Sequence, residues 1–384
     1  MRILLLGEYS NVHATLAEGL RQMGHDVTVV SNGDFWKDYP RDIDVSRQPG
    51  HWGGLKLLMR VARLLPRLRG YDVVQLINPM FLELKACRLF PIYRYLRRHN
   101  SRMVLCAMGM DYYWVSECTY RKPMRYSDFN MGDQVRTDEP ALREQRDWIG
   151  TDKERLNRMI ANDCDGIIAG LYDDYVCYQP HFPQKLHFIP LPIKNLSQQE
   201  KTCNAEADIP DLEKKIPTDA TMIRLFIGIS RGRSGYKGTD IMLQAAEDVQ
   251  QRYPDRLEIV KAEGVPFAQY QHMMDHCDVM MDQLYSYTPA MNALLAMSKG
   301  IVVIGGGEPE GYNILNEVEL RPIINVEPSF ESVRQALEDL VVHPERLQEL
   351  KRQSKEYVKR HHDYLKVAAA YDRIYRLILF NTKK

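Results

Sequence analysis

Residues 1–31 read MRILLLGEYSNVHATLAEGLRQMGHDVTVVS, in which two strand patterns flank a helical one. Residues 2–6 form a short apolar run that ends at Gly7, and residues 27–31 form a second run after Gly24. Between the runs, apolar residues recur at the spacing of one helix face: Val12, Leu16, Leu20 and Met23. A strand, a helix and a strand in this order predict the start of a parallel, doubly wound sheet.

The same alternation of strand and helix patterns continues along the chain. Buried strand patterns recur in a first series at residues 73–77, 103–107, 166–169 and 186–189. A second series follows at residues 223–229, 257–260, 279–281, 301–304 and 322–326. The polar segment 194–221 separates the two series. We therefore expect an α/β protein of two facing, Rossmann-like domains with a cleft between them. The predicted bounds are 1–195 and 196–360, with a final helix in 361–384 that packs back on the first domain.

The composition argues against several classes of function. The 384 residues carry 51 basic and 51 acidic side chains, a balance that disfavours a chain-wide nucleic-acid-binding surface. The seven cysteines form no C-x-x-C pair, and scattered cysteines suit a reducing compartment. No apolar run reaches the ~18 residues of a membrane span. We expect a cytoplasmic protein with no nucleic-acid partner and no bound metal.

The strongest local motif is GISRGRSGYKG, residues 228–238, which follows a predicted strand and leads into a predicted helix. Its glycines allow the backbone to approach a ligand closely, and Arg231 and Lys237 supply a planar fork and a point charge for phosphate groups. The motif does not match the Walker pattern G-x-x-x-x-G-K-[ST]. It predicts a polyanion site, and the alternative is a solvated basic turn.

Two further motifs follow strands of the same domain. In SYTPAMNALLAMSKG, residues 286–300, Thr288 and Pro289 predict the N-cap and first residue of a helix whose free N–H groups favour anions. In IVVIGGGEPEGY, Glu308 and Glu310 follow a glycine turn, where carboxylates accept hydrogen bonds from the hydroxyls of ribose or sugar. The alternatives are a capped crossover helix and an acidic surface turn. All three motifs are expected at one edge of the sheet, where open α/β sheets bind ligands.

Two strand-end loops of the first domain carry candidate polar groups. The loop GEYSNVH runs from Gly7 to His13 and lacks the dinucleotide fingerprint G-x-G-x-x-G. Asp111 follows the strand predicted at 103–107. His13 is expected either to face the cleft or to begin a helix, and Asp111 either to contact substrate hydroxyls or to cap the next segment.

Residues 51–102 are strongly basic, with eleven cations against two acids. Part of this segment has helical spacing, with leucines on one face and cations on the other: Lys56, Arg60, Arg63 and Arg67. A basic amphipathic helix predicts peripheral contact with an anionic membrane. The alternative is an ordinary surface helix whose leucines face the core.

With these motifs the chain resembles glycosyltransferases of the GT-B fold and is similar to glycosyltransferase family 4. The resemblance covers most of the chain and is strongest over residues 223–312. Arg231 and Lys237 resemble the family's Arg and Lys-Gly pair. The stretch HCDVMMDQLYSYTPAMNALLAMSKGIVVIGG resembles the family's path from an Asp-containing strand through a helix to a Gly-Gly turn. Four residues match its Gly-Gly-x-Pro-Glu pattern: Gly306, Gly307, Pro309 and Glu310.

The resemblance implies an enzyme of the hexosyltransferase type. It would move a sugar from a nucleoside-diphosphate sugar to a glycan or lipid-linked acceptor in cell-surface polysaccharide synthesis. Transfer would proceed with retention and without metal or cofactor. The basic segment 51–102 would suit a membrane-proximal acceptor, which places the protein at the inner face of the membrane. Arg231 and Lys237 would neutralise the departing diphosphate on the second domain. The acceptor would lie on the first domain, beside His13 and Asp111. These two residues would act as catalytic groups together with Arg231 and Lys237. Further donor contacts would come from Gly7, Thr288, Pro289, Asn292, Gly307, Glu308 and Glu310.

Departures from the family pattern keep other functions open. Tyr287 and Leu295 stand where the family commonly has two glutamates, and Met108 stands where it often has a histidine. A non-catalytic sugar-nucleotide or glycan-binding protein and a nucleotide-sugar epimerase on the same fold are the alternatives. A metal-dependent transferase would have to use an Asp-x-Asp pattern, at 42–44 or 163–165, and such short patterns arise easily by chance.

Overall fold

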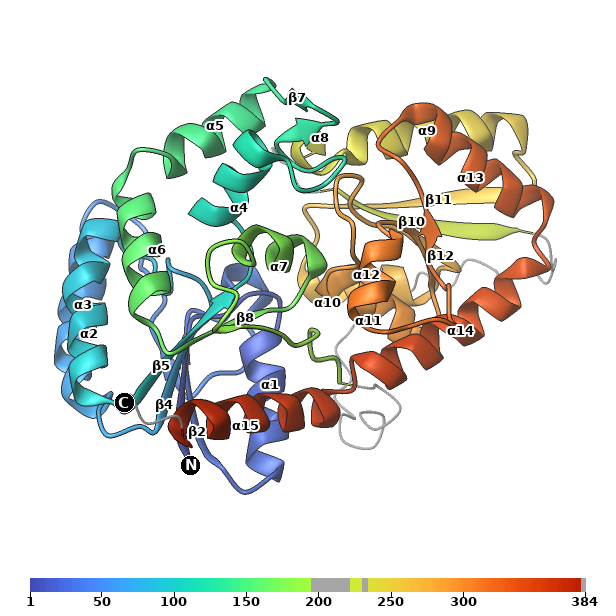
Figure 1. Cartoon of the computed structure of the whole chain (residues 1–384). Coiled ribbons are helices and arrows are strands. Elements are labelled where there is room, and N and C mark those ends of the chain that lie inside the picture. The colour runs from blue at the N-terminus through green and yellow to red at the C-terminus, as the bar shows by residue number, and fades with distance from the viewer. Residues whose placement is uncertain (195–221, 230–233, 381–384) are drawn as a thin grey trace.

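The computed structural model describes residues 1–194, 222–229 and 234–380 of the chain. It contains two α/β domains, each built on a parallel sheet with helices on both faces (Figure 1). The predicted class, two facing doubly wound domains, is confirmed.

The first domain holds a seven-stranded sheet in the order β3-β2-β1-β4-β5-β8-β9. Its strands are β1 (Arg2–Leu6), β2 (Asp26–Ser31), β3 (Ile43–Asp44), β4 (Val73–Leu76), β5 (Arg102–Ala107), β8 (Gly166–Ala169) and β9 (Leu186–Phe188). In the register, Ile3 pairs with Val27 on one side and with Val73 on the other. The central strands are covered on both faces, which explains their nearly continuous apolar runs.

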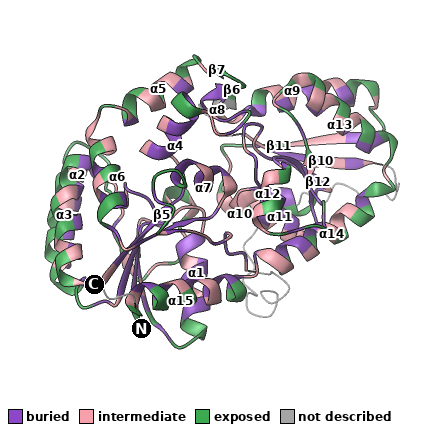
Figure 2. Ribbon diagram, viewed as in Figure 1, coloured by how far each residue is buried: buried purple, intermediate pink, exposed green. Residues whose placement is uncertain are grey.

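The helices of the first domain lie in the connections between these strands. They are α1 (Val12–Gln22), α2 (Gly53–Leu64), α3 (Ala86–His99), α4 (Tyr112–Ser116), α5 (Glu139–Trp148), α6 (Asp152–Asp163) and α7 (Tyr172–Tyr178). Short helical turns are η1 (Phe35–Lys37), η2 (Leu65–Arg67) and η3 (Glu117–Arg121). Figure 2 shows that the central strands are buried, whereas much of α2 and α3 is exposed. In the described part of the chain, every helix falls short of the length and apolarity that a membrane crossing needs.

The second domain holds a five-stranded sheet in the order β11-β10-β12-β13-β14. Its strands are β10 (Ile223–Ile229), β11 (Leu257–Glu263), β12 (Val279–Met281), β13 (Val302–Gly305) and β14 (Ile324–Asn325). Its helices are α8 (Ser234–Lys237), α9 (Thr239–Arg252), α10 (Phe267–Asp275), α11 (Met291–Lys299), α12 (Pro309–Ile314), α13 (Phe330–Val342) and α14 (Arg346–His361).

The last helix, α15 (Tyr364–Phe380), returns to the first domain and lies against α1 (Figure 1). A Cβ atom at Gly19 of α1 would lie 2.7 Å from the Cβ of Ala368, so glycine permits this close approach. The Tyr375 hydroxyl donates to Gln75 Oε1 in β4 at 2.7 Å. The two ends of the chain are therefore packed on the same sheet.

The predicted start of the helix at 289–299 is wrong by two residues. The helix α11 begins at Met291, and Ala290, not Thr288, occupies the N-cap. The Thr288 hydroxyl instead donates to Asp173 of the first domain at 2.5 Å, so it is not available to cap the helix. The helix ends at Gly300, which has a φ of +82° at the C-cap.

The segment between β5 and α6 projects toward the second domain (Figure 1). It includes a small antiparallel hairpin of β6 (Asn130–Met131) and β7 (Gln134–Val135). After this hairpin, Arg136 donates to the Gly235 carbonyl at 3.2 Å, and its guanidinium lies 3.8 Å from the centre of the Tyr285 ring. This segment thus connects the two domains on one side of the cleft.

Candidate functional site

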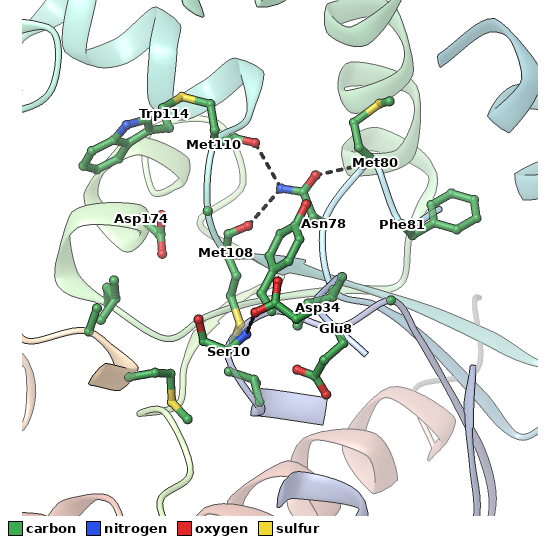
Figure 3. Close-up of a pocket in the computed structure, with 18 of the residues that line it drawn as sticks. Glu8, Ser10, Asp34, Asn78, Met80, Phe81, Met108, Met110, Trp114 and Asp174 are labelled. Atoms are coloured by element: carbon green, nitrogen blue, oxygen red, sulfur yellow. Dashed lines mark hydrogen bonds between the residues drawn. The ribbon is translucent and has the colours of Figure 1, made fainter. Parts of the chain in front are cut away.

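A cavity of about 650 Å³ lies between the two domains, at the carboxyl ends of both sheets. The first domain contributes the loops after β1, β4, β5 and β8, and the second contributes Lys237 and the loop between β12 and α11. Strand ends of two open sheets facing each other are the expected position for a ligand site in this architecture. Figure 3 shows part of the first-domain wall.

The loop after β1 turns sharply at Gly7, which lines the cavity with a φ of +84°. A Cβ atom here would lie 2.4 Å from the Ile77 side chain, so the close approach requires glycine. The Glu8 carboxyl accepts hydrogen bonds from the backbone N–H groups of His13 at 3.2 Å and Ala14 at 2.8 Å. Glu8 thus occupies the N-terminus of α1, where a ligand phosphate would otherwise find free N–H groups.

His13 lies behind this loop, fully buried, and does not line the cavity. Its Nδ1 lies 2.8 Å from the Gly7 carbonyl oxygen and its Nε2 lies 3.0 Å from Gln75 Nε2. Because the Gly7 oxygen can only accept, Nδ1 carries the proton, and Nε2 accepts from the Gln75 amide. Burial lowers the pKa of His13 to about 4, so the ring is neutral near pH 7. The histidine holds the Gly7 turn against the sheet.

Asp111 is also buried behind the wall, although its neighbours Gly109 and Met110 line the cavity. It is the N-cap of α4, where Oδ1 accepts from the Trp114 N–H at 2.9 Å. Its Oδ2 accepts from the Tyr178 hydroxyl of α7 at 2.6 Å. Burial raises the pKa of Asp111 to about 6. Both oxygens are thus used to join α4 to α7.

On the second-domain wall, Lys237 and the first turn of α11 lie around the same cavity, which Ala290 and Met291 also line. Burial raises the pKa of the nearby Asp282, and the charge of Lys237 opposes that rise. A lysine beside the N-terminal end of a helix is a combination that favours an anionic group. Arg231, the other predicted cation, lies outside the described residues.

The loop that carries Thr288 and Pro289 is bound to the first domain by one carboxylate. Asp173 of α7 accepts from the Tyr287 N–H at 2.8 Å, from the Thr288 hydroxyl, and from the Ser286 hydroxyl at 3.3 Å. Pro289 is buried and, like Thr288, does not line the cavity. Asp173 therefore fixes how the two cavity walls face each other.

Glu308 and Glu310 are engaged in a second contact between the domains. Arg125, from the projecting segment, forms ion pairs with Glu308 and, at 2.8 Å, with Glu310. The Tyr126 hydroxyl donates to Glu308 Oε1 at 2.6 Å. Glu308 is buried, and neither carboxylate lines the cavity. Tyr287 is buried beneath this cluster, with its ring centre 5.1 Å from the Arg125 guanidinium.

The two remaining residues predicted to contact the donor, Gly307 and Asn292, form hydrogen bonds within the second domain. The Gly307 N–H donates to Asn325 Oδ1 at 2.9 Å, and the Asn292 amide donates to the Tyr270 hydroxyl at 2.7 Å. Neither residue lines the cavity. Of the predicted site residues that the structure describes, it brings Gly7 and Lys237 to the cavity and places the others in the layer around it.

The residues that sequence reasoning missed come from the first domain. Asn78, at the end of β4, donates to the carbonyls of Met108 and Met110 at 2.8 and 3.1 Å and accepts from the Met80 N–H (Figure 3). Asp173 and Asp174 follow β8, so the strand-end rule used for the other loops would have found them. The contacts of Arg125 leave no comparable signal in the sequence.

The two Asp-x-Asp patterns are occupied by ion pairs. Asp42 pairs with Arg21 at 2.5 Å, and Asp44 pairs with Arg41 at 2.9 Å. Arg97 pairs with both Asp163 and Asp165, at 3.3 and 2.5 Å. Within the described ranges, no three His, Cys, Asp or Glu side chains gather as a metal ion would require.

No family model matches this sequence, and no curated protein matches it. Solved structures match it over nearly the whole chain. A sucrose-phosphate synthase from Thermosynechococcus elongatus is 14% identical with a TM-score of 0.58, and each chain is covered completely. The catalytic domain of starch synthase IV from Arabidopsis thaliana, bound to ADP and acarbose, is 9% identical with a TM-score of 0.60 and 99% of each chain covered. The UDP-GlcNAc 2-epimerase from Neisseria meningitidis, bound to UDP-GlcNAc, is 10% identical with a TM-score of 0.53, covering 97% of this chain and 99% of that one. These likenesses show the fold, which is the GT-B fold.

Proposed function

We propose that this chain is a glycosyltransferase of the family 4 type, which moves a sugar from a nucleoside-diphosphate sugar to a glycan or lipid-linked acceptor. The observation that carries the proposal is the cavity between the two domains, with Lys237 and the first turn of α11 on one wall. Its volume, about 650 Å³, is in the range of small-molecule sites. Two of the matched structures with this fold are a sucrose-phosphate synthase and a starch synthase.

In this proposal the second-domain wall stabilises the leaving group. The bond between the sugar C1 and the phosphate oxygen breaks, and its electron pair moves to the nucleoside diphosphate. An oxygen of an acceptor hydroxyl forms the new bond to C1, and the proton of that hydroxyl passes to the departing phosphate oxygen. Lys237 and the N–H groups at the start of α11 are fixed in place before the charge develops, so they stabilise it without reorganising. Arg231, which follows β10 in the sequence, would add a second cation.

The first-domain wall holds the acceptor. His13 and Asp111 were predicted as catalytic groups, but both are buried behind the wall with their polar atoms engaged. We assign them positioning roles, in which His13 holds the Gly7 turn and Asp111 joins α4 to α7. Retention, independence from metal and a role in cell-surface polysaccharide synthesis are parts of the proposal that follow from the family resemblance.

The outer face of α2 supports peripheral contact with an anionic membrane. Trp52, Leu55 and Met59 are exposed large apolar side chains at the start and along one side of this helix. They lie among the exposed cations Lys56, Arg63 and Arg67. Exposed apolar side chains between cations are typical of helices that lie in a membrane interface.

A nucleotide-sugar epimerase is the second candidate. One of the matched structures is an epimerase, and the Glu308 and Glu310 carboxylates pair with Arg125 instead of facing the cavity. An epimerase converts its nucleotide sugar without an acceptor, and a glycosyltransferase releases nucleoside diphosphate when an acceptor is present.

The experiment is a turnover assay of the full chain with UDP-, ADP- and GDP-sugars, with and without a mixture of glycan acceptors. Nucleoside diphosphate release that depends on acceptor and is lost in Lys237→Ala supports transfer. Lys359→Ala, an exposed lysine on α14, is the control and should retain activity. Epimer formation without acceptor would replace the transferase assignment, and loss of turnover in EDTA would contradict metal independence.

A further inference from the structure

The first-domain half of the cavity, where the acceptor is proposed to bind, has many more acidic than basic side chains. Counted over the described residues, the first domain lines the cavity with seven carboxyl groups and two lysines. Both lysines are paired with carboxylates, Lys37 with Asp34 at 2.6 Å and Lys153 with Asp147. Among the described lining residues of this wall, no lysine is therefore left for an anionic ligand, while the Glu83 and Glu144 carboxylates remain at the cavity.

The N-terminus of α1, whose first residue Val12 lines the cavity, does not compensate for the lack of a free lysine on this wall. The N-terminus of α1 is occupied by the Glu8 carboxyl, which accepts from two of its N–H groups. A phosphate or carboxylate of an acceptor would have to displace this internal carboxyl. On the opposite wall the Asp282 carboxyl likewise accepts from the Ala290 N–H at the start of α11, but Lys237 also lines the cavity there and supplies a positive charge. The two halves of the cavity thus differ in the charge that they accept.

Asp174 provides a specific polar contact on the acceptor side. It lines the cavity from α7 and is only 6% exposed, and its Oδ2 has no hydrogen-bond partner among the described residues. In Figure 3 its carboxyl group lies beside Met108 and near Trp114, on the cavity wall. Buried polar groups in folded proteins are nearly always hydrogen-bonded, so an unpartnered oxygen at a cavity indicates a ligand contact.

The surroundings of Asp174 favour its uncharged form. Burial raises the pKa of Asp174 well above its usual range, and the nearby charges of Asp111, Asp173 and Asp128 raise it further. A protonated carboxyl both donates and accepts a hydrogen bond, which matches a hydroxyl group. Apolar side chains elsewhere on the same wall of the cavity, including Met80, Phe81 and Met108, suit the C–H faces of a sugar ring.

We infer that the first-domain half of the cavity selects an uncharged sugar residue as acceptor, and that Asp174 binds a hydroxyl of that sugar. The inference rests on the proposed function and goes beyond it, since it names the charge class of the acceptor. An acceptor that places a phosphate or uronate group in this half is excluded. Anionic groups elsewhere on a longer acceptor, such as a lipid diphosphate at the membrane, are compatible with it.

The test compares sugars that differ only at C6. The full chain is saturated with the nucleoside diphosphate that stabilises it most, and binding of the methyl glycosides of glucose, galactose and mannose is measured by calorimetry and saturation-transfer NMR. The same measurement is made with the corresponding methyl uronides, in which a carboxylate replaces the hydroxymethyl group. At least one neutral glycoside is expected to bind about tenfold more tightly than its uronide, because the two lysines that the described residues of this wall supply are already paired with carboxylates.

Variants of Asp174 test the named contact. Asp174→Ala should weaken binding of that neutral glycoside by about tenfold, because the hydroxyl loses its partner. Asp174→Asn should restore most of it, since an amide also donates and accepts. Asp255→Asn, at an exposed position, is the control and should change nothing. Thermal unfolding of each variant checks that it is folded. The comparison of neutral glycosides with uronides uses the wild-type protein alone, so it tests the inference even if a variant does not fold.

The outcomes separate this inference from the proposed function. If no nucleoside diphosphate stabilises the wild-type protein, the proposed function fails and the inference fails with it. If a nucleoside diphosphate binds but uronides bind as well as the neutral glycosides, or no neutral glycoside binds, the inference alone is overturned. If Asp174→Ala weakens binding of the nucleotide sugar and leaves binding of the glycosides unchanged, Asp174 contacts the donor and its assignment to the acceptor is wrong.

Discussion

Arg125 is predicted to hold the two domains together, and its removal gives a measurable loss of stability. The side chain joins Glu308 and Glu310 and lies over the Tyr287 ring, so Arg125→Ala removes three contacts at once. The backbone N–H of Arg125, which donates to the Tyr287 hydroxyl at 2.6 Å, is unaffected by the substitution. The side-chain contribution is therefore isolated.

The size of the loss follows from the burial of each partner. The pair with Glu310 is partly exposed and contributes at most about 1 kcal/mol, and the stacking on Tyr287 contributes about 0.5 kcal/mol. Glu308 is buried and keeps only the Tyr126 hydroxyl, so leaving it without its cation costs about 1–2 kcal/mol. Because the arginine itself is more than half exposed, solvent screening keeps the total at about 2–3 kcal/mol.

The assay is urea unfolding of wild type, Arg125→Ala, Glu308→Gln and the double variant. The double variant should lose less than the sum of the single ones, since the two substitutions remove the same pair. Arg146→Ala is the matched control, because Arg146 pairs with Glu139 and both are largely exposed. It should cost less than about 0.5 kcal/mol. Equal losses for Arg125→Ala and Arg146→Ala, or strictly additive losses in the cycle, would refute the reasoning.

Three further predictions follow from the cavity walls and the surface. Burial lowers the pKa of His13 from 6.5 to about 4 in the folded protein. Between these two pH values the histidine is protonated in the unfolded chain but not in the folded one, so the free energy of unfolding falls as the pH falls. The expected loss is about 2 kcal/mol at pH 5. Chemical unfolding at pH 7 and pH 5 should show this loss, and a His13→Gln variant with the same pH dependence as wild type would contradict it. Gly7→Ala places a Cβ 2.4 Å from Ile77 at a φ of +84°, and should cost at least about 2 kcal/mol in the same assay, whereas Gly24→Ala, with open space around it, should cost only about 1 kcal/mol of backbone strain. Replacing three exposed cations with glutamate should lower binding to vesicles that contain anionic lipid by about 1 kcal/mol per cation and leave binding to neutral vesicles unchanged. The three are Lys56 and Arg63 of α2 and Arg67 of the following turn η2. Binding by the variant equal to that of wild type would remove the membrane proposal.

The fold could be predicted from the sequence because its determinants are local. Short apolar runs such as residues 2–6 and 27–31, each ended by a glycine or polar residue, are sufficient to define strands of a parallel sheet. The rule that ligands bind at the carboxyl ends of strands then selected the loops at Gly7 and Lys237, and both lie at the cavity. The spacing of apolar residues and the order of the strands are therefore enough to predict the fold class and these two loops, without any knowledge of long-range contacts.

The remaining part of the site depends on contacts between residues far apart in the chain. Arg125 meets Glu308 across the two domains, and no local pattern marks either residue for the other. The same cause explains the error at the start of α11, where the capping residue that propensity favours, Thr288, donates instead to Asp173. Tyr287 stands where the family resemblance calls for a glutamate, and in the structure its ring packs against Arg125 and Tyr126 at the contact between the domains.

The central claim is that the Lys237 wall binds a nucleoside diphosphate, and thermal unfolding of the wild-type protein and of Lys237→Ala with UDP, ADP and GDP tests it most directly. A ligand at about 100 times its Kd stabilises the folded state by about 2.7 kcal/mol. For a chain of this length, with an unfolding entropy of about 2.1 cal/mol/K per residue, that corresponds to a rise of roughly 3 °C in Tm. The account predicts such a rise with one of the three nucleotides, lost in Lys237→Ala and kept in Lys359→Ala. An unchanged Tm with all three, or an equal rise in Lys237→Ala, would contradict it.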